Sequence, residues 1–121
     1  MKTEGNTAAL KSKAFALRIV KLYRYLCDEK HEYVLSKQLL RSGTSIGANL
    51  AEAEFAVSRN DFSSKVYIAL KECGETIFWL DLLRDSEYLA ESEYESIICD
   101  ARELLRMLQA STKTLKSKET P

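Results

Sequence analysis

The chain has 121 residues, of which 45% are hydrophobic and 30% charged, a composition typical of one soluble globular domain. With four glycines and a single proline at the last position, it has too few turn residues for a β fold and favours long helices. The formal net charge of zero argues against strong non-specific attraction to nucleic acid. No apolar run suits a membrane span and no signal peptide is evident, so we expect a cytoplasmic protein without membrane contact.

The first helix is predicted from about residue 8 to 28, with Asn6 or Thr7 as its N-cap. Apolar residues occupy one face, and the opposite face is purely basic, since no acidic residue occurs between Leu10 and Cys27. Such a face indicates either nucleic-acid binding or ion pairs with acids of the third or fourth helix. The nucleic-acid-binding candidates, which include two basic residues of the next helix, are Lys11, Lys13, Arg18, Lys21, Arg24, Lys37 and Arg41.

The second helix is predicted from about residue 32 to 54 and contains the unusual stretch RSGTSIGANLAEA at 41–53. Gly43, Gly47 and Ala51 are four residues apart, so they form one smooth ridge that lets another backbone approach closely. Each glycine costs about 0.8–1 kcal/mol relative to alanine, and close packing would offset that cost. The alternative, a phosphate-binding loop, is disfavoured because the stretch has no Walker or G-x-G-x-x-G pattern and no preceding strand.

A polar stripe follows another side of this helix, formed by Gln38, Ser42, Ser45 and Asn49. These side chains suit either a bound ligand or hydrogen bonds to a neighbouring helix, and we favour the neighbouring helix.

The third helix is predicted from residue 58 to 83, where Ser58 and Asp61 resemble a capping box. Its core stripe runs from Phe62 to Leu80, yet other sides are also apolar, which indicates more than one neighbour. We therefore expect self-association through the second and third helices. The candidates for close helix packing or an oligomer interface are Leu40, Gly43, Thr44, Gly47, Ala51, Tyr67, Ile68, Phe78 and Trp79.

The fourth helix is predicted to begin near Ser92, since Ser92 and Glu95 match a capping box, and it has a single apolar face. Four helices of about 20 residues joined by short loops predict an all-α fold, an up-down-up-down antiparallel four-helix bundle. Residues 1–121 form one domain in this interpretation, with an ordered core over about 8–115.

No residue pattern indicates catalysis. The only histidine, His31, falls in a polar turn, and Glu72 and Glu75 point away from the predicted core stripe as surface or interface carboxylates. Cys27, Cys73 and Cys99 are widely separated, so we interpret them as small buried apolar residues. We therefore predict a protein that is not an enzyme, with no metal site, no cofactor and no small-molecule substrate.

Three segments, FALRIVKLYRYL (15–26), VLSKQLLRSGTSIGANLAEA (34–53) and ALKECGETIFWLDLL (69–83), resemble the four-helix bundle family named after the 23S rRNA intervening sequence. The resemblance covers about residues 8–115. It implies a ring-shaped homo-oligomer, a pentamer, and offers no catalytic residues to transfer. A structurally similar relative, the accessory variability protein of diversity-generating retroelements, is a basic pentamer that binds nucleic acid, whereas this chain is neutral.

Two functions are compatible with these features. In the favoured one, the oligomer binds RNA or a ribonucleoprotein through the basic face of the first helix, repeated in every subunit. In the alternative, the oligomer is a structural adaptor for a protein partner, and the basic face pairs with the acidic region between Glu72 and Glu103 of a neighbouring subunit.

Overall fold

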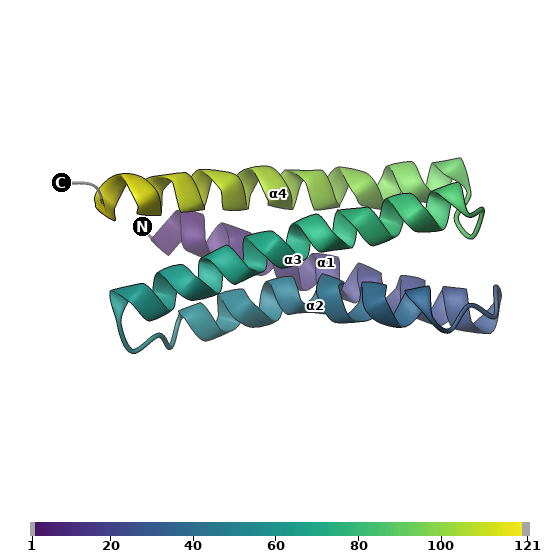
Figure 1. The fold of residues 1–121 in the computed structure, drawn as a ribbon, viewed down its shortest axis with the longest axis horizontal. Helices are drawn as coiled ribbons and strands as arrows, with labels where there is room; N and C mark the ends of the chain where they lie inside the picture. Colours follow the sequence, from purple (N-terminus) through teal and green to yellow (C-terminus); the bar gives the residue numbers. More distant parts are fainter. Residues whose placement is uncertain (1, 120–121) are drawn as a thin grey trace.

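The computed structural model describes residues 2–119, with side chains from 7 to 118, and these residues form four helices without strands. They are α1 (Lys2–Asp28), α2 (Leu35–Ala53), α3 (Arg59–Asp85) and α4 (Glu91–Glu119). Successive helices run side by side in opposite directions (Figure 1), so the expected all-α, four-helix arrangement is confirmed. Each helix packs against the next, α4 also packs against α1, and the backbones of the diagonal pairs do not come close in the described residues.

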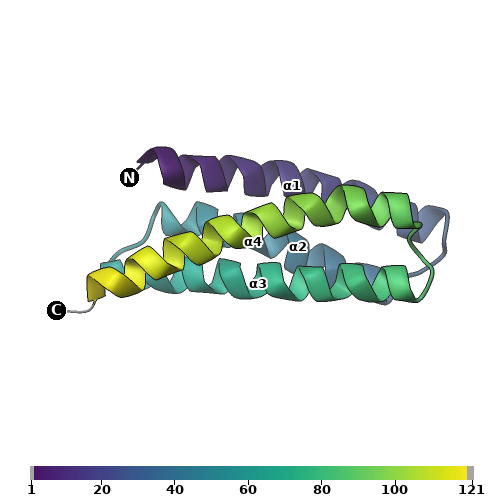
Figure 2. The same cartoon turned by 90° about the horizontal axis from the view of Figure 1, so that it is seen from above.

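The helix α4 crosses the bundle obliquely. Figure 2 shows that it starts beside α1 and ends away from it, over α3. Packing between α1 and α4 is accordingly the sparsest of the four helix contacts. None of the helices, within the residues described, is long and apolar enough to cross a membrane.

The core draws buried apolar side chains from all four helices. Each fully buried leucine, isoleucine or phenylalanine contributes about 1.5–3 kcal/mol relative to an exposed one. The largest of these fully buried apolar side chains include Phe15, Ile19, Leu26, Leu39, Ile46, Leu80, Leu83, Ile98, Leu104 and Leu108.

Two predicted helix starts are corrected. The helix α1 extends back to Lys2, so neither Asn6 nor Thr7 is its N-cap. The helix α2 begins at Leu35 because His31 takes a left-handed conformation, φ 55°, and interrupts the helical backbone.

Glu32, in the turn before α2, stabilises the start of that helix. Its carboxylate accepts hydrogen bonds from the backbone N–H groups of Val34, Leu35 and Ser36, at 3.1, 2.9 and 2.7 Å. Burial alone would raise the pKa of Glu32, but these hydrogen bonds outweigh burial and leave the pKa below its usual value. The ionised carboxylate is therefore the form that holds the turn.

Side chains also cap the starts of α3 and α4, but the predicted capping residues are correct only for α3. Ser58 Oγ accepts the Asp61 N–H at 3.0 Å, which confirms the predicted cap. For α4 the start at Glu91 agrees with the predicted start near Ser92, but the predicted capping box of Ser92 and Glu95 was wrong. Glu93 Oε1 accepts the Ala90 N–H at 2.8 Å, so the reaching carboxylate is Glu93 and not Glu95.

The glycines of the 41–53 stretch lie in a helix and face α1 of the same chain. A Cβ at Gly43 would lie 2.8 Å from Ile19 Cγ1, and one at Gly47 would lie 3.2 Å from Ser12 Oγ. Ala51, the third member of the predicted ridge, is exposed. The two glycines thus make room for α1 of the same chain.

Candidate nucleic-acid interface

Two of the seven basic candidates are neutralised by α4. Arg18 Nη1 lies 2.7 Å from Asp100 Oδ2, and Arg18 Nη2 donates to Ser96 Oγ at 2.8 Å. Lys11 Nζ lies 2.9 Å from Glu103 Oε1 and 3.9 Å from Asp100 Oδ1. These polar bridges link α1 to α4 where apolar packing is sparse, so Lys11 and Arg18 have a structural role.

Arg41 is neutralised by α3. Its guanidinium nitrogens lie 3.5 Å from Glu72 Oε1 and 2.5 Å from Glu75 Oε2, and Trp79 Nε1 also donates to Glu75 at 3.1 Å. The hydrogen bond from Trp79, with the one from Arg41, lowers the pKa of Glu75. Glu72 is buried, so its expected position away from the core was wrong. The buried carboxylate needs its cation, which leaves Arg41 poorly placed for phosphate.

The four remaining candidates are exposed and form no ion pair within the side chains described: Lys13, Lys21, Arg24 and Lys37. The first three belong to one sector of α1 at about 100° per residue, and Lys37 lies on α2.

Two leucines that the sequence did not single out share this sector. Leu10 is 71% exposed and Leu17 is 59% exposed, between and beside the cations. We call this face the outer α1 stripe, formed by Leu10, Lys13, Leu17, Lys21 and Arg24. Their helical spacing away from the core stripe was the signal that could have identified the leucines. The stripe combines positive charge with exposed apolar surface.

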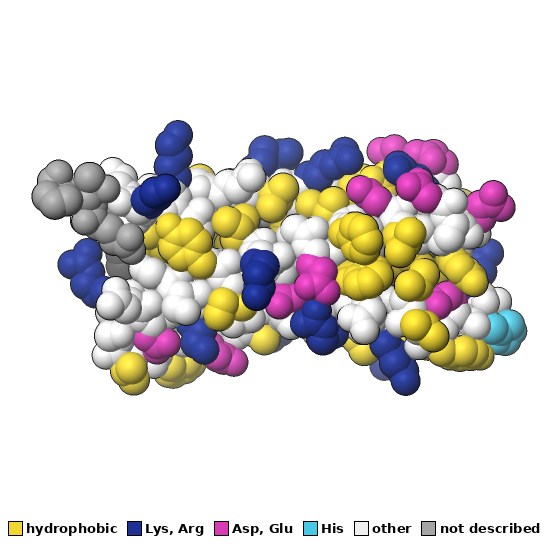
Figure 3. All heavy atoms as spheres, in the orientation of Figure 1, with side chains coloured by type: hydrophobic (Ala, Val, Ile, Leu, Met, Phe, Trp, Pro, Cys, Tyr) yellow, Lys and Arg dark blue, Asp and Glu magenta, His cyan; other side chains and the backbone are white. Residues whose placement is uncertain are grey.

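The outward face of α3 is also apolar. Tyr67 and Phe78 are exposed, Ile68 and Trp79 are half-buried, and Gly74 has open space around it. Figure 3 shows hydrophobic side chains gathered on the face formed by α2, α3 and α4. These residues are available for an interface, and their role in an oligomer stays a prediction.

The polar stripe of α2 serves mainly its own helix. Ser42 is the exception, because its buried hydroxyl accepts a hydrogen bond from Thr76 of α3 at 3.0 Å. Ser45 donates to the Arg41 carbonyl and Asn49 to the Ser45 carbonyl, at 2.6 and 2.8 Å. The stripe therefore contains one helix-to-helix bond.

The cysteines differ in environment. Cys73 is buried, and burial raises the pKa of its thiol to about 12. Cys27 is half-buried, but Cys99 is exposed, contrary to the expectation that all three are buried. Within the described part of the chain, no three His, Cys, Asp or Glu side chains gather in a way that could hold a metal ion.

Comparisons with known proteins, by family model and by structure, point to one family. The model of the family described as 23S rRNA-intervening sequence protein matches residues 5–110. A similar crystal structure is that of a protein of unknown function from the S23 ribosomal protein family of Bacteroides thetaiotaomicron VPI-5482. It is 52% identical in sequence, with a TM-score of 0.89, over 91% of this chain and 98% of that chain. No curated protein matches.

Proposed function

The chain belongs to the 23S rRNA-intervening sequence protein family, and on that basis we propose that it is a non-enzymatic homo-oligomer that binds RNA or a ribonucleoprotein. The contact surface is the outer α1 stripe, repeated in each subunit. One observation carries the proposal: Lys13, Lys21 and Arg24 are exposed on one face without an ion pair to any described side chain, whereas Lys11, Arg18 and Arg41 are held by acids of the same chain.

Charge and repetition act together in this proposal. Three cations per subunit release few counterions from RNA, so one copy binds weakly. Several copies on one particle bind the same RNA with a high effective concentration, which raises the overall affinity without new contacts. Because the chain is neutral overall, this attraction comes from local groups of cations such as the stripe and not from the net charge.

The apolar outward face of α3 supports the oligomer. An exposed patch around Tyr67, Phe78 and Gly74 is unfavourable in water and typical of a protein interface. Burying it between subunits would leave the outer α1 stripe free, since α1 and α3 lie diagonally opposite in the bundle without close backbone approach. The family resemblance implies that five subunits form a ring.

An adaptor function is the second candidate. The version of this hypothesis in which the basic face pairs with acids of a neighbouring subunit loses support, because Asp100 and Glu103 already bind Lys11 and Arg18 within the chain. The exposed leucines favour another form, in which the outer α1 stripe binds an acidic amphipathic helix of a protein partner.

A charge-matched pair of variants tests the proposal. The first replaces Lys13, Lys21 and Arg24 by glutamine, and the control replaces Lys71, Arg106 and Lys113, which are exposed on α3 and α4. Binding of a fluorescent RNA is followed by anisotropy over a range of salt concentrations. We expect the first variant alone to lose affinity at least tenfold and to reduce the slope of log K against log salt by about 2. Equal effects of both variants would refute the outer α1 stripe as the contact surface.

A further inference from the structure

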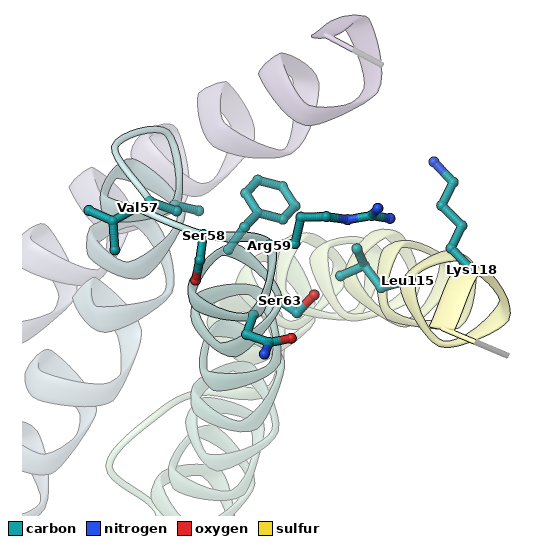
Figure 4. Close-up of a pocket in the computed structure, with 10 residues that line it drawn as sticks. Val57, Ser58, Arg59, Ser63, Leu115 and Lys118 are labelled. Atoms are coloured by element: carbon teal, nitrogen blue, oxygen red, sulfur yellow. The ribbon is translucent and has the colours of Figure 1, made fainter.

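At the end of the bundle where α2 turns into α3, a hollow of about 660 Å³ opens between this turn, the first turns of α3 and the last turns of α4. In Figure 4, Arg59 and Lys118 extend from α3 and α4 toward the same open side, with Leu115 beside them. The full lining is Ala53, Ala56, Val57, Ser58, Arg59, Asn60, Phe62, Ser63, Leu115 and Lys118.

The lining is positively charged. It contains two cations and no carboxylate, and neither Arg59 nor Lys118 forms an ion pair with another described side chain. The acid nearest to Arg59 in sequence, Asp61, is engaged elsewhere, since its Oδ2 accepts the Val57 N–H at 3.1 Å. The hollow therefore favours a ligand with negative charge.

The lining also presents an aromatic ring. Phe62 belongs to the predicted core stripe, but it is 41% exposed because it lies on the wall of this hollow. Val57 on the turn is more exposed still, and Leu115 is half-buried. An aromatic surface beside two cations suits a ligand that has both a flat ring and an anionic group.

We propose that the hollow binds one unpaired nucleotide of a single-stranded RNA, with the base stacked on Phe62 and a phosphate held by Arg59 and Lys118. The volume lies within the range of about 300–1,000 Å³ that small-ligand sites occupy. Arg59 suits a phosphate because its guanidinium donates two parallel hydrogen bonds. The Asn60 amide and Ser63 hydroxyl, which also line the hollow, offer hydrogen bonds to the edge of the base.

This inference rests on the proposed function and adds the class of RNA. A base inside a duplex is stacked between its neighbours and cannot stack on Phe62, so the hollow selects unpaired RNA. The outer α1 stripe, by contrast, contacts phosphates of either form.

The test compares Phe62→Leu with Phe55→Leu in the full chain. Phe55 is 82% exposed on the turn between α2 and α3 but does not line the hollow, so its replacement controls for the loss of a nearby exposed phenylalanine. Anisotropy is measured at low salt with a short single-stranded oligouridine and with an RNA duplex. We expect Phe62→Leu to weaken single-strand binding about tenfold and to leave duplex binding unchanged, and Phe55→Leu to change neither. The second variant is Arg59→Gln, at an exposed position, and we expect it to weaken single-strand binding several-fold.

The outcomes separate the two proposals. If Phe62→Leu and Arg59→Gln bind the single strand as the wild type does, while the Lys13, Lys21 and Arg24 variant loses binding, the hollow is refuted and the proposed function stands. If Phe62→Leu weakens duplex and single strand equally, base stacking is refuted. If the wild-type chain binds neither RNA, both proposals fail.

Discussion

Replacing Gly43 by alanine tests the close approach of α1 and α2. The new Cβ would lie 2.8 Å from Ile19 Cγ1 and 2.9 Å from Cγ2, and Ile19 is fully buried. Both contacts are with atoms next to the branch point, so the side chain cannot swing away and a helix must shift. Overpacking of this kind costs about 1–3 kcal/mol. Alanine recovers about 0.8–1 kcal/mol of helix propensity, so we expect a net loss of about 1 kcal/mol.

Gly74→Ala is the matched control. It lies in the interior of α3 with nothing of its own chain within 4 Å of the added Cβ, so helix propensity gives a gain of about 0.8–1 kcal/mol, which a subunit packed on the outward face of α3 would reduce. Gly47→Ala should fall between the two, because Ser12 Oγ at 3.2 Å must give way by only a few tenths of an ångström.

Urea unfolding at one fixed protein concentration measures all three variants, since the stability of an oligomer depends on concentration. Adding Ile19→Ala to Gly43→Ala removes both clashing atoms, so the double variant should be more stable than the sum of the single effects. If Gly43→Ala stabilises the protein as much as Gly74→Ala does, the close approach of α1 and α2 is refuted.

Three further predictions concern pH, the α1–α4 contact and the thiols. The pKa of Glu32 is lower in the folded state, so its contribution to stability is present above the unfolded pKa and is lost as pH falls through the folded pKa. In urea at pH 7, Glu32→Gln should be less stable than the wild type by about 1–3 kcal/mol, and it should lose less stability on acidification. Equal losses of stability on acidification in the variant and the wild type would contradict the capping role. Arg18→Gln should cost at most about 1 kcal/mol, because the pair is partly exposed, while speeding hydrogen exchange at the facing turns of α1 and α4; unchanged exchange would argue against the bridge. An aromatic disulfide reagent should modify Cys99 rapidly and Cys73 only after unfolding, and rapid modification of Cys73 in the native protein would contradict its burial.

Local features of the sequence predicted the helices well, and the errors at their ends have local causes. Ser58 was identifiable as a cap because its hydroxyl and Asp61 match a known pattern. The start of α4 was ambiguous, since acidic residues stand three positions after both Ala90 and Ser92. Serine is the better capping residue and therefore predicts a box at Ser92, but the helix begins where the Glu93 carboxylate reaches Ala90.

The candidate site depended on contacts between distant residues. The periodicity of α1 identified a basic face, but not that Arg18 meets Asp100, 82 positions away, or that Lys11 meets Glu103. The spacing of Gly43 and Gly47 indicated close packing without showing that α1 is the neighbour. The exposure of Phe62 depends on where α4 passes over the turn before α3, which no local pattern encodes.

The most direct test of the central claim is the mass of the particle by light scattering at low salt, with and without single-stranded RNA. We predict an oligomer, of five subunits as the family resemblance implies, that gains the mass of bound RNA, and the same oligomer without added mass when Lys13, Lys21 and Arg24 are glutamine. A monomer, or an oligomer whose mass RNA does not change, would contradict the account.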